Sequence, residues 1–313
     1  MTAGVVAVTT TNQKTLVCIV GPTAVGKTLV GISLAKTFGT EIISTDSRQF
    51  YAEMNIGTAK PSPEELAEVL HHFVGFLSVK ETYSAGDFER DALKKLDELF
   101  RQHDVVFLVG GSGLFVQAVC RGMDELPVVE EQIRERYNRL FTEEGLPILQ
   151  QLLEEKDPVY FQTVDRQNPQ RVIRALEVIE ATGKPFSDLH KKNWAKRAFE
   201  VVTIGLDLPR EILYQRINER VDTMLEKGLV KEARSLEVYR DTYALQTVGY
   251  AELYQFFDGK ISYEQAIDLI KQNSRRYAKR QLTWFRRDPE TQWFAPDDLD
   301  SMAKFIRQKK HQA

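Results

Sequence analysis

A short stretch near the N-terminus, from Gly21 to Thr28, has the residue types and spacing of a phosphate-binding loop. In this G-x-x-x-x-G-K-T pattern the glycines let backbone N–H groups converge on an anion, Lys27 adds a positive charge, and the Thr28 hydroxyl can bind Mg²⁺. An apolar run, 15–20, precedes the loop and a helical sequence from Leu29 follows it, so the positive end of a helix would face the phosphate. The pattern predicts a polyphosphate ligand with Mg²⁺ and leaves the reaction undefined. The predicted phosphate-binding residues are Gly21, Pro22, Thr23, Ala24, Val25, Gly26, Lys27 and Thr28.

Asp46 is the first candidate catalytic residue outside this loop. It follows the predicted strand 39–44, and ligands of open α/β sheets bind at the carboxyl ends of the strands. Capping of the following turn is the open alternative for Asp46. The adjacent His71 and His72 would point to opposite sides of a strand, so we expect them to be structural or to line a substrate site rather than to bind a metal.

A glycine-rich turn follows the next predicted strand, 104–109. An ordinary P-loop ATPase or kinase would carry an aspartate there to hold Mg²⁺. This chain has Gly110, Gly111, Ser112 and Gly113 instead. Glycines allow a backbone to approach a ligand closely, and the Ser112 hydroxyl adds a donor. The turn therefore disfavours a nucleotide kinase.

The elements around these groups predict an α/β fold. With 313 residues, 42% of them hydrophobic, the chain is long enough for one large domain and a smaller one. Strand and helix patterns alternate at first and resume at 199, whereas the segment between contains helices divided by prolines. We predict a P-loop NTPase-like doubly wound parallel sheet with an inserted all-helical domain and a helical C-terminal region. The predicted domains are a catalytic core of 15–123 and 199–313, a helical insertion of 124–198, and a disordered lead-in of 1–14.

Positive charge gathers on the long helix that follows a capping box at Ser262, although the net charge of the chain is −3. The helix and its end carry seven basic residues with no acid among them, namely Lys271, Arg275, Arg276, Lys279, Arg280, Arg286 and Arg287. Such a run predicts a nucleic-acid-binding face. We assign the aromatic residues between them to the core, with base stacking as the alternative.

Two pairs of arginines are further candidates for anion contacts. Arg171 and Arg174 share one face of a helix in the insertion, and the basic segment 190–197 follows. A solvated face and contact with an anionic polymer are both open for them. Arg216 and Arg220 lie one turn apart on the helix after the strand that begins at 199, where arginines can reach a phosphate.

Cysteine content and hydropathy favour a cytoplasmic protein. Cys18 and Cys120 cannot build a disulfide framework or a C-x-x-C metal site, which suits a reducing cytosol. The first fourteen residues lack the basic and apolar parts of a signal peptide, and no run has the length of a membrane span. We expect no membrane association and a monomer.

Taken in order, these motifs resemble those of the bacterial tRNA dimethylallyltransferases, also called the IPP transferase family. The resemblance extends over about 17–287. The matching motifs are 21–28, Asp46-Ser-Arg-Gln49, Gly57-Thr-Ala-Lys-Pro61, His71-His72, Tyr83-Ser-Ala-Gly-Asp-Phe88, Gly110-Gly-Ser-Gly-Leu114, Asn168-Pro-Gln-Arg171, Arg174-Ala-Leu-Glu177, Val248-Gly-Tyr250 and Lys279-Arg-Gln-Leu-Thr-Trp-Phe-Arg286. Ser112 stands where the family usually has threonine, Phe50 and Phe115 where it often has tyrosine, and Gln246 where some members have arginine.

The resemblance implies transfer of a dimethylallyl group from dimethylallyl diphosphate to N6 of adenosine 37 in the anticodon loop of tRNA, with release of diphosphate. Asp46 would be the general base, Ser112 would orient the reacting groups, and Lys27, Arg216 and Mg²⁺ on Thr28 would stabilise the leaving group. The implied tRNA-binding residues are Asp46, Ser47, Arg48, Gln49, Ser112, Arg134, Gln170, Arg171, Val172, Ile173, Arg174, Gln246, Gly249, Lys279, Arg280 and Arg286.

Three other classes are the alternatives. A P-loop kinase of small metabolites would need the aspartate that the glycine turn replaces. An adenylate isopentenyltransferase would have less need of the helical insertion and the basic C-terminal helix. A non-catalytic RNA-binding protein would need no diphosphate loop. The acceptor of a labelled dimethylallyl group distinguishes them.

Overall fold

The computed structural model describes residues 13–124, 126–127, 129–190 and 194–312. The chain divides into two compact units, which we call the core unit (1–120 and 197–313) and the insertion unit (121–196). Most of the predicted lead-in, 1–12, lies outside the described residues, as do 191–193 of the basic segment.

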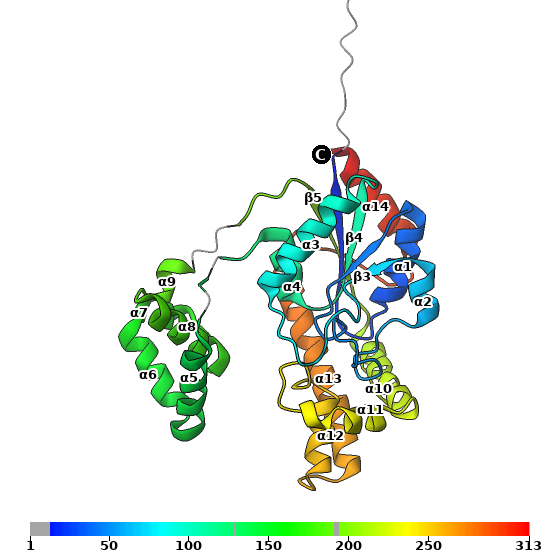
Figure 1. The fold of residues 1–313 in the computed structure, drawn as a ribbon. Coiled ribbons are helices and arrows are strands. Elements are labelled where there is room, and N and C mark those ends of the chain that lie inside the picture. Colours follow the sequence, from blue (N-terminus) through cyan, green and yellow to red (C-terminus); the bar gives the residue numbers. More distant parts are fainter. Residues whose placement is uncertain (1–12, 125, 128, 191–193, 313) are drawn as a thin grey trace, which may run out of the picture. The chain divides into compact units, whose positions relative to one another are not determined.

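The core unit alternates strands and helices up to α4, whereas a run of helices separates its last two strands, β5 and β6 (Figure 1). Its elements are β1 (Thr15–Val20), α1 (Lys27–Phe38), β2 (Ile42–Ser44), α2 (Pro63–Glu68), β3 (His71–His72), α3 (Ala85–Leu99), β4 (Val105–Val109), α4 (Gly113–Arg121), β5 (Glu200–Leu206), α10 (Arg210–Glu226), α11 (Leu229–Ser235), the 3₁₀ helix η1 (Glu237–Tyr239), α12 (Tyr250–Phe257), α13 (Tyr263–Phe285), β6 (Gln292–Phe294) and α14 (Leu299–Gln312).

The strands form one sheet in the order β3-β2-β4-β1-β5-β6, and each neighbouring pair is parallel. β1 is buried along its whole length, as its apolar and β-branched sequence predicts. Its side chains alternate between the two faces: Val17 and Ile19 share a core with α1 and α14, whereas Leu16 and Cys18 share one with α3 and α4. The predicted doubly wound α/β fold is confirmed.

The strand β6 was not predicted. It pairs with β5 at the edge of the sheet, with Ile204 opposite Gln292 and Leu206 opposite Phe294. A three-residue strand is too short to show a period of two in the sequence. The long helix predicted from the capping box at Ser262 is confirmed as α13, and the Ser262 hydroxyl accepts a hydrogen bond from the N–H of Gln265.

Three loops meet where β1, β2 and β4 end, because parallel strands in register present their carboxyl ends at one edge of the sheet. Ser44 of β2 lies opposite Val109 of β4, and the N–H of Thr45 donates to the Val109 carbonyl at 2.8 Å. A Cβ on Gly110 would lie 2.2 Å from the Thr45 hydroxyl oxygen, so only glycine allows this close approach. The phosphate-binding loop, the Asp46 turn and the glycine-rich turn are thereby neighbours.

The helices α10, α11, α12 and α13 lie beyond this edge of the sheet (Figure 1). They surround a separate apolar core that includes Val221, Leu229, Leu253 and Ile270. One end of α13 belongs to this core and the other reaches the cores of the sheet through Ala278 and Phe285. These helices form the wall that faces the three loops.

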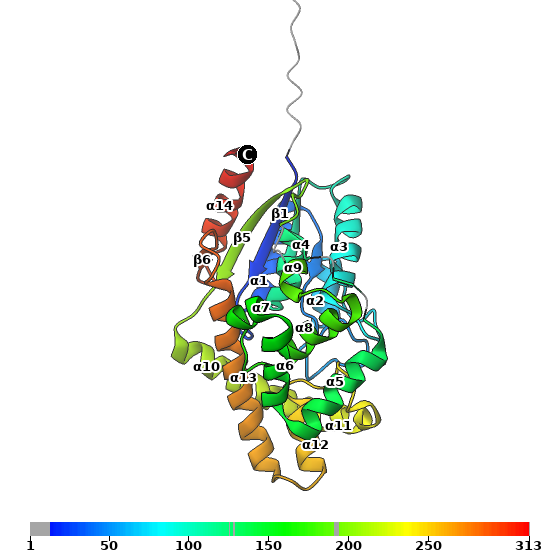
Figure 2. The ribbon, with the colours of Figure 1, turned by 90° about the vertical axis from the view of Figure 1, so that its left-hand side faces the viewer.

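The insertion unit is a bundle of short helices, α5 (Glu131–Glu144), α6 (Leu146–Lys156), α7 (Pro158–Thr163), α8 (Pro169–Thr182) and α9 (Phe186–Leu189), drawn in green in Figure 2. α8 is the most buried of them, with Val172 and Leu176 packed against Leu149 and Leu153 of α6. Asn168 caps α8 by accepting a hydrogen bond from the N–H of Arg171 at 3.3 Å.

Cys18 and Cys120 are free thiols whose sulfur atoms lie 3.3 Å apart, a contact between β1 and α4 that the sequence did not indicate. The hydrogen bond with Cys120, together with burial, raises the pKa of the Cys18 thiol well above its usual value. Among the described residues we find no helix that combines the length and the apolar character needed to cross a membrane.

Candidate active site

The phosphate-binding loop is built on backbone conformations that its glycines permit. Gly26 has φ 109° at the start of α1, and Gly21 has φ 143° with its α-carbon so close to β5 that a Cβ would lie 2.6 Å from the Leu206 carbonyl oxygen. The loop leads into α1 with Lys27 as its first residue. The N-terminal end of a helix thus faces the loop, as the sequence predicts.

Lys27 is folded back onto its own loop. Its ammonium group donates hydrogen bonds to the carbonyl oxygens of Gly21, at 3.0 Å, and Pro22, at 2.8 Å. Burial lowers the pKa of Lys27 from 10.5 to about 8, and the positive charge of Arg220 also lowers it, while the carboxylate of Asp46 raises it. The lysine is therefore placed where an anion would restore its full positive charge.

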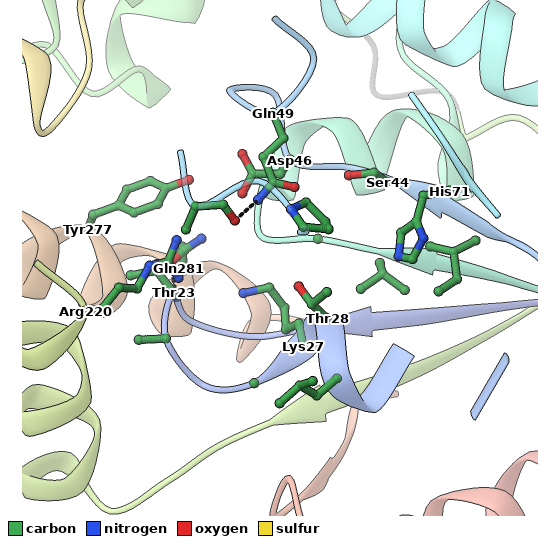
Figure 3. A pocket seen from close by; sticks show the side chains of 18 residues that line it. Thr23, Lys27, Thr28, Ser44, Asp46, Gln49, His71, Arg220, Tyr277 and Gln281 are labelled. Carbon is green, nitrogen blue, oxygen red and sulfur yellow. Dashed lines mark hydrogen bonds between the residues drawn. The ribbon is translucent and has the colours of Figure 1, made fainter. Parts of the chain in front are cut away.

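A cavity of about 200 Å³ lies above the loop, and its walls come from several parts of the core unit (Figure 3). Lys27 and Thr28, at the start of α1, approach it from one side, while Asp46, just after β2, enters from the opposite side. Arg220 of α10 and Tyr277 of α13 close a further side. One cation-bearing loop and one carboxylate thus face the same small volume.

A second cavity of about 780 Å³ adjoins the first and shares part of its lining. The shared residues are Thr23, Ala24, Asp46, Arg220, Tyr277 and Gln281. Beyond them the larger cavity is lined by Ser112 and Trp284, and by apolar side chains of α10 and α13 that include Met224 and Ile270. Asp46 therefore belongs to the wall that the two cavities have in common.

Asp46 uses one carboxylate oxygen to hold its own turn, because Oδ1 accepts a hydrogen bond from the N–H of Arg48 at 3.1 Å. The capping role left open from the sequence is thus present, and it coexists with a place in both cavities. Burial and the negative charge of Asp46 raise the pKa of Tyr277 to about 12. Burial lowers the pKa of Arg220, and the same carboxylate partly offsets this lowering. Asp46 is electrostatically coupled to Lys27, Arg220 and Tyr277.

Ser112 ties the glycine-rich turn to the Asp46 turn. Its hydroxyl oxygen accepts a hydrogen bond from the N–H of Ser47, and the hydroxyl donates to the Ser47 hydroxyl oxygen, both at 3.1 Å. The sequence predicted that the glycines of this turn make room for a ligand. Gly110 lines the smaller cavity, and Gly111 and Gly113 line the larger one. Gly111 and Gly113 also make room for α13, because a Cβ on Gly111 would lie 2.2 Å from Gln281 and one on Gly113 would lie 2.3 Å from Trp284.

Gln281 is a functional candidate that the sequence analysis did not single out, although it lies within the motif 279–286. Its side-chain oxygen accepts a hydrogen bond from the N–H of Thr23 at 2.8 Å, and its side-chain nitrogen donates to the Gly111 carbonyl at 2.9 Å. It is only 5% exposed and joins the phosphate-binding loop to the glycine-rich turn. A glutamine within an apolar helical stripe was the available signal, because buried amides need partners.

The predicted role of Arg216 in stabilising the leaving group is not supported by its position. Its side chain is exposed and lines neither cavity, whereas Arg220, one turn later on α10, lines both. The sequence indicated both arginines as candidates, and our choice of Arg216 for the leaving group selected the one that does not reach a cavity.

Comparison with known proteins identifies the family. The family model described as IPP transferase matches residues 49–288, which is more than half of the chain. The chain belongs to the IPP transferase family. The tRNA dimethylallyltransferase of Christiangramia forsetii is 52% identical over 283 residues, which cover 90% of this chain and 94% of that protein. The corresponding protein of Cytophaga hutchinsonii is 49% identical over 297 residues, covering 95% and 98%.

Solved structures of this family share the fold. The tRNA isopentenylpyrophosphate transferase of Bacillus halodurans is 39% identical, with a TM-score of 0.72 over 96% of this chain and 98% of that chain. A eukaryotic dimethylallyltransferase acting on tRNA is 25% identical, with a TM-score of 0.74 over 95% of this chain and 77% of that chain. The resemblance seen in the motifs is therefore confirmed.

Several residues that the IPP transferase motifs implied as tRNA contacts are buried or engaged elsewhere. Val172 and Ile173, 0% and 7% exposed, pack in the core of the insertion unit, so their side chains offer almost no surface for the predicted contact with tRNA. Gln49 is 8% exposed and donates to the carbonyl oxygens of Thr58 and Ala59. The amide nitrogen of Gln49 therefore holds the wall of the smaller cavity, which Gln49 itself lines.

The remaining predicted contacts lie in three settings. Ser47, Arg48, Gln246, Gly249 and Arg280 line the larger cavity, Lys279 and Arg286 are exposed at the C-terminal part of α13 and just after it, and Gln170, Arg171, Arg174 and Arg134 belong to the insertion unit. Arg48 donates to the Tyr243 carbonyl at 2.6 Å and stacks over the Tyr243 ring. Arg134 and Arg174 both pair with Glu177, a carboxylate that is 2% exposed.

The basic face of α13 is less positive than its sequence indicates. Lys271 forms an ion pair with Asp222 at 2.6 Å, and Arg286 forms one with Asp207 at 2.5 Å. Both acids belong to other elements of the core unit. The run of seven basic residues is therefore partly neutralised in the fold.

Proposed function

We propose that this chain transfers the dimethylallyl group of dimethylallyl diphosphate to N6 of adenosine 37 in the anticodon loop of tRNA, and releases diphosphate. The observation that carries the proposal is the position of Asp46. It stands in the wall shared by a small cavity with a phosphate-binding loop and a larger cavity that can admit a nucleobase. The curated relatives of the chain carry the name of this activity.

The phosphate-binding loop would hold the leaving group. In this reaction the allylic C–O bond breaks, and the diphosphate departs with the bonding electron pair. Lys27 and Arg220 carry the positive charge that stabilises it, together with the N–H groups at the start of α1. We propose Arg220 for the role first given to Arg216, because Arg220 lines the cavity.

The residues of the small cavity fit a magnesium ion that is shared with the substrate. The Thr28 hydroxyl lines the cavity next to Lys27. Among the described residues no group of three histidine, cysteine or acidic side chains could hold a metal alone. That donor set suits Mg²⁺, which commonly takes few protein ligands and completes its shell with phosphate oxygens and water. When bound, the ion would add positive charge at the departing diphosphate.

Asp46 would act as the general base for the adenine amine. As the new bond between N6 and the allylic carbon forms, a proton leaves N6, and the carboxylate of Asp46 accepts it. Its Oδ1 is occupied by the N–H of Arg48, which leaves Oδ2 for this proton. The hydroxyl of Ser112 lines the same large cavity and would orient the base. The nucleobase must leave the stack of the anticodon loop to reach this position.

The tRNA itself would be held by cations of both units. Arg48 and Arg280 line the larger cavity, and Arg134, Arg171 and Arg174 supply positive charge in the insertion unit. We propose that the protein acts as a monomer. We propose that the reaction takes place in the cytoplasm, in line with a tRNA substrate.

Transfer of a labelled dimethylallyl group tests the proposal. The protein is incubated with Mg²⁺, labelled dimethylallyl diphosphate and one of three acceptors: a tRNA with adenosine 37, the same tRNA with guanosine 37, or AMP. We expect label in the first acceptor only, on N6 of the modified nucleoside. Label in AMP would assign the chain to adenylate isopentenyltransferases, and the absence of label from every acceptor would refute the proposal.

A further inference from the structure

Glu232 of α11 holds the loop around residues 55–57, which lies far from Glu232 in the sequence. Its carboxylate accepts hydrogen bonds from three consecutive backbone N–H groups, those of Asn55, Ile56 and Gly57, at 2.9–3.0 Å. It also accepts the hydroxyl of Tyr250 at 2.6 Å. Three successive N–H groups that converge on one point form an anion-binding concavity, and here a side chain of the protein fills it.

The loop held in this way forms part of the wall of both cavities. Gly57 and Thr58 line the larger cavity, and Ala59 and Pro61 line the smaller one. The fit is tight, because a Cβ on Gly57 would lie 2.5 Å from the ring of Tyr250. The position of the wall therefore depends on α11 and α12 rather than on the loop alone.

The loop is connected to the Asp46 turn through Gln49. The amide nitrogen of Gln49 donates to the carbonyl oxygens of Thr58 and Ala59, at 3.1 and 3.0 Å. The backbone N–H of Gln49 in turn donates to the Asp46 carbonyl at 3.0 Å. A continuous chain of hydrogen bonds thus runs from Glu232 through the loop and Gln49 to Asp46.

We infer that Glu232 is a positioning residue for the proposed catalytic carboxylate of Asp46. The inference rests on the proposed function, since it assigns a role within that reaction. Glu232 does not line either cavity, so it acts through the loop and Gln49. Misplacement of a reacting group by about 1 Å can lower a rate by roughly a hundredfold, so loss of the carboxylate should be visible in the chemical step.

Glu232→Gln is the sharpest variant. Oε2 accepts from Asn55 and Ile56, and Oε1 accepts from Ile56, Gly57 and Tyr250. In either orientation the new NH₂ group would face at least two N–H donors, and the loop must shift away. Glu226→Gln removes the same charge from an exposed residue at the end of α10 and is the matched control.

Single-turnover rates with saturating tRNA and dimethylallyl diphosphate test the inference. We expect Glu232→Gln to lower the rate constant roughly tenfold to a hundredfold with little change in the KM for tRNA, and Glu226→Gln to keep the rate of the unmodified protein. The decisive comparison measures the effect of Glu232→Gln both in the unmodified protein and in the Asp46→Ala protein. If Glu232 acts through Asp46, Glu232→Gln should change the residual rate of the Asp46→Ala protein by less than about twofold.

Equal effects in both backgrounds would show that Glu232 serves general stability and would overturn the inference, as would an unchanged rate in Glu232→Gln. Should that variant fail to fold, Tyr250→Phe removes a single hydrogen bond to the carboxylate. We expect it to lower the rate severalfold, again only when Asp46 is present, and a normal rate there would also overturn the inference. If the unmodified protein transfers no label, the proposed function itself fails. That outcome is distinct from failure of the inference on Glu232, which requires an active unmodified protein.

Discussion

The pKa of Lys27 gives the site a pH dependence that can be measured before any chemistry occurs. In the free protein burial lowers this pKa to about 8. A bound diphosphate favours the charged ammonium and raises the pKa again. Above pH 8 the free lysine is largely neutral, so binding of dimethylallyl diphosphate must take up a proton, and the affinity falls as the pH rises.

The size of the effect follows from the fraction of protein that carries the charged lysine. The dissociation constant increases by the factor 1 + 10^(pH − pKa), which is about 1.1 at pH 7 and about 11 at pH 9 for a pKa near 8. We therefore expect dimethylallyl diphosphate to bind about tenfold more weakly at pH 9 than at pH 7. Arg220 contributes no such slope, because a guanidinium stays protonated throughout this range.

Isothermal titration calorimetry without tRNA measures both quantities. Titrations at pH 7, 8 and 9 give the affinity, and a pair of buffers with different ionisation enthalpies gives the number of protons taken up, which should be about one half at pH 8. Lys27→Arg is the control, because arginine does not titrate between pH 7 and 9. The affinity of this variant for dimethylallyl diphosphate should therefore be independent of pH. Constant affinity in the unmodified protein, or an equal slope in Lys27→Arg, would refute the assignment of Lys27 to the diphosphate.

Three further predictions concern the base, the arginine and the basic helix. Asp46→Ala should lower the single-turnover rate by roughly 10²–10⁴-fold while tRNA affinity by filter binding is nearly unchanged, and a normal rate would remove Asp46 from the role of base. Arg220→Ala should weaken dimethylallyl diphosphate binding, measured by calorimetry, by at least about tenfold, whereas Arg216→Ala should have little effect; the reverse order would restore the first assignment. Arg280→Ala should reduce the salt slope of tRNA binding by about one, and Lys271→Ala, whose partner is Asp222, should change it much less; equal changes would contradict a tRNA-facing role of Arg280.

The parts of the site that the sequence predicted well are those whose signals are contiguous. The glycines and lysine of the loop from Gly21 to Thr28 occupy adjacent positions, and their function depends on local backbone geometry. Asp46 and Ser112 follow predicted strands, and parallel strands place their carboxyl ends at one edge of a sheet. Proximity of the three loops therefore followed from strand pairing alone.

Choosing between Arg216 and Arg220 required the tertiary structure. Residues four apart on a helix lie on nearly the same face, so periodicity gives them similar directions. What separates them is the axial position of α10 relative to the phosphate-binding loop, which packing against the rest of the core unit determines. The burial of Val172 and Ile173 has a different reason. A contiguous motif on a helix includes positions that face the core, and these two residues occupy such positions.

The charge on α13 illustrates a different limit. Along the sequence its cations have no acid among them, and this local view predicted a strongly positive face. The acids that neutralise two of them, Asp222 and Asp207, lie 49 and 79 positions away from Lys271 and Arg286 and reach them only in the fold. Local charge patterning therefore indicated the kind of partner and overstated the strength of the field.

α13 also explains what replaces the missing acid after β4. In a P-loop kinase that position belongs to a metal-binding aspartate, whereas here Gly111 and Gly113 leave room for Gln281 and Trp284. Gln281 then bonds to the phosphate-binding loop, and Arg280, its neighbour on the same helix, lines the larger cavity. We infer that α13 holds the phosphate-binding loop through Gln281 and places Arg280 in the larger cavity. A shift of α13 on tRNA binding would therefore move both the loop and Arg280. The glycine-rich turn thus leaves room for a helix whose side chains line both cavities.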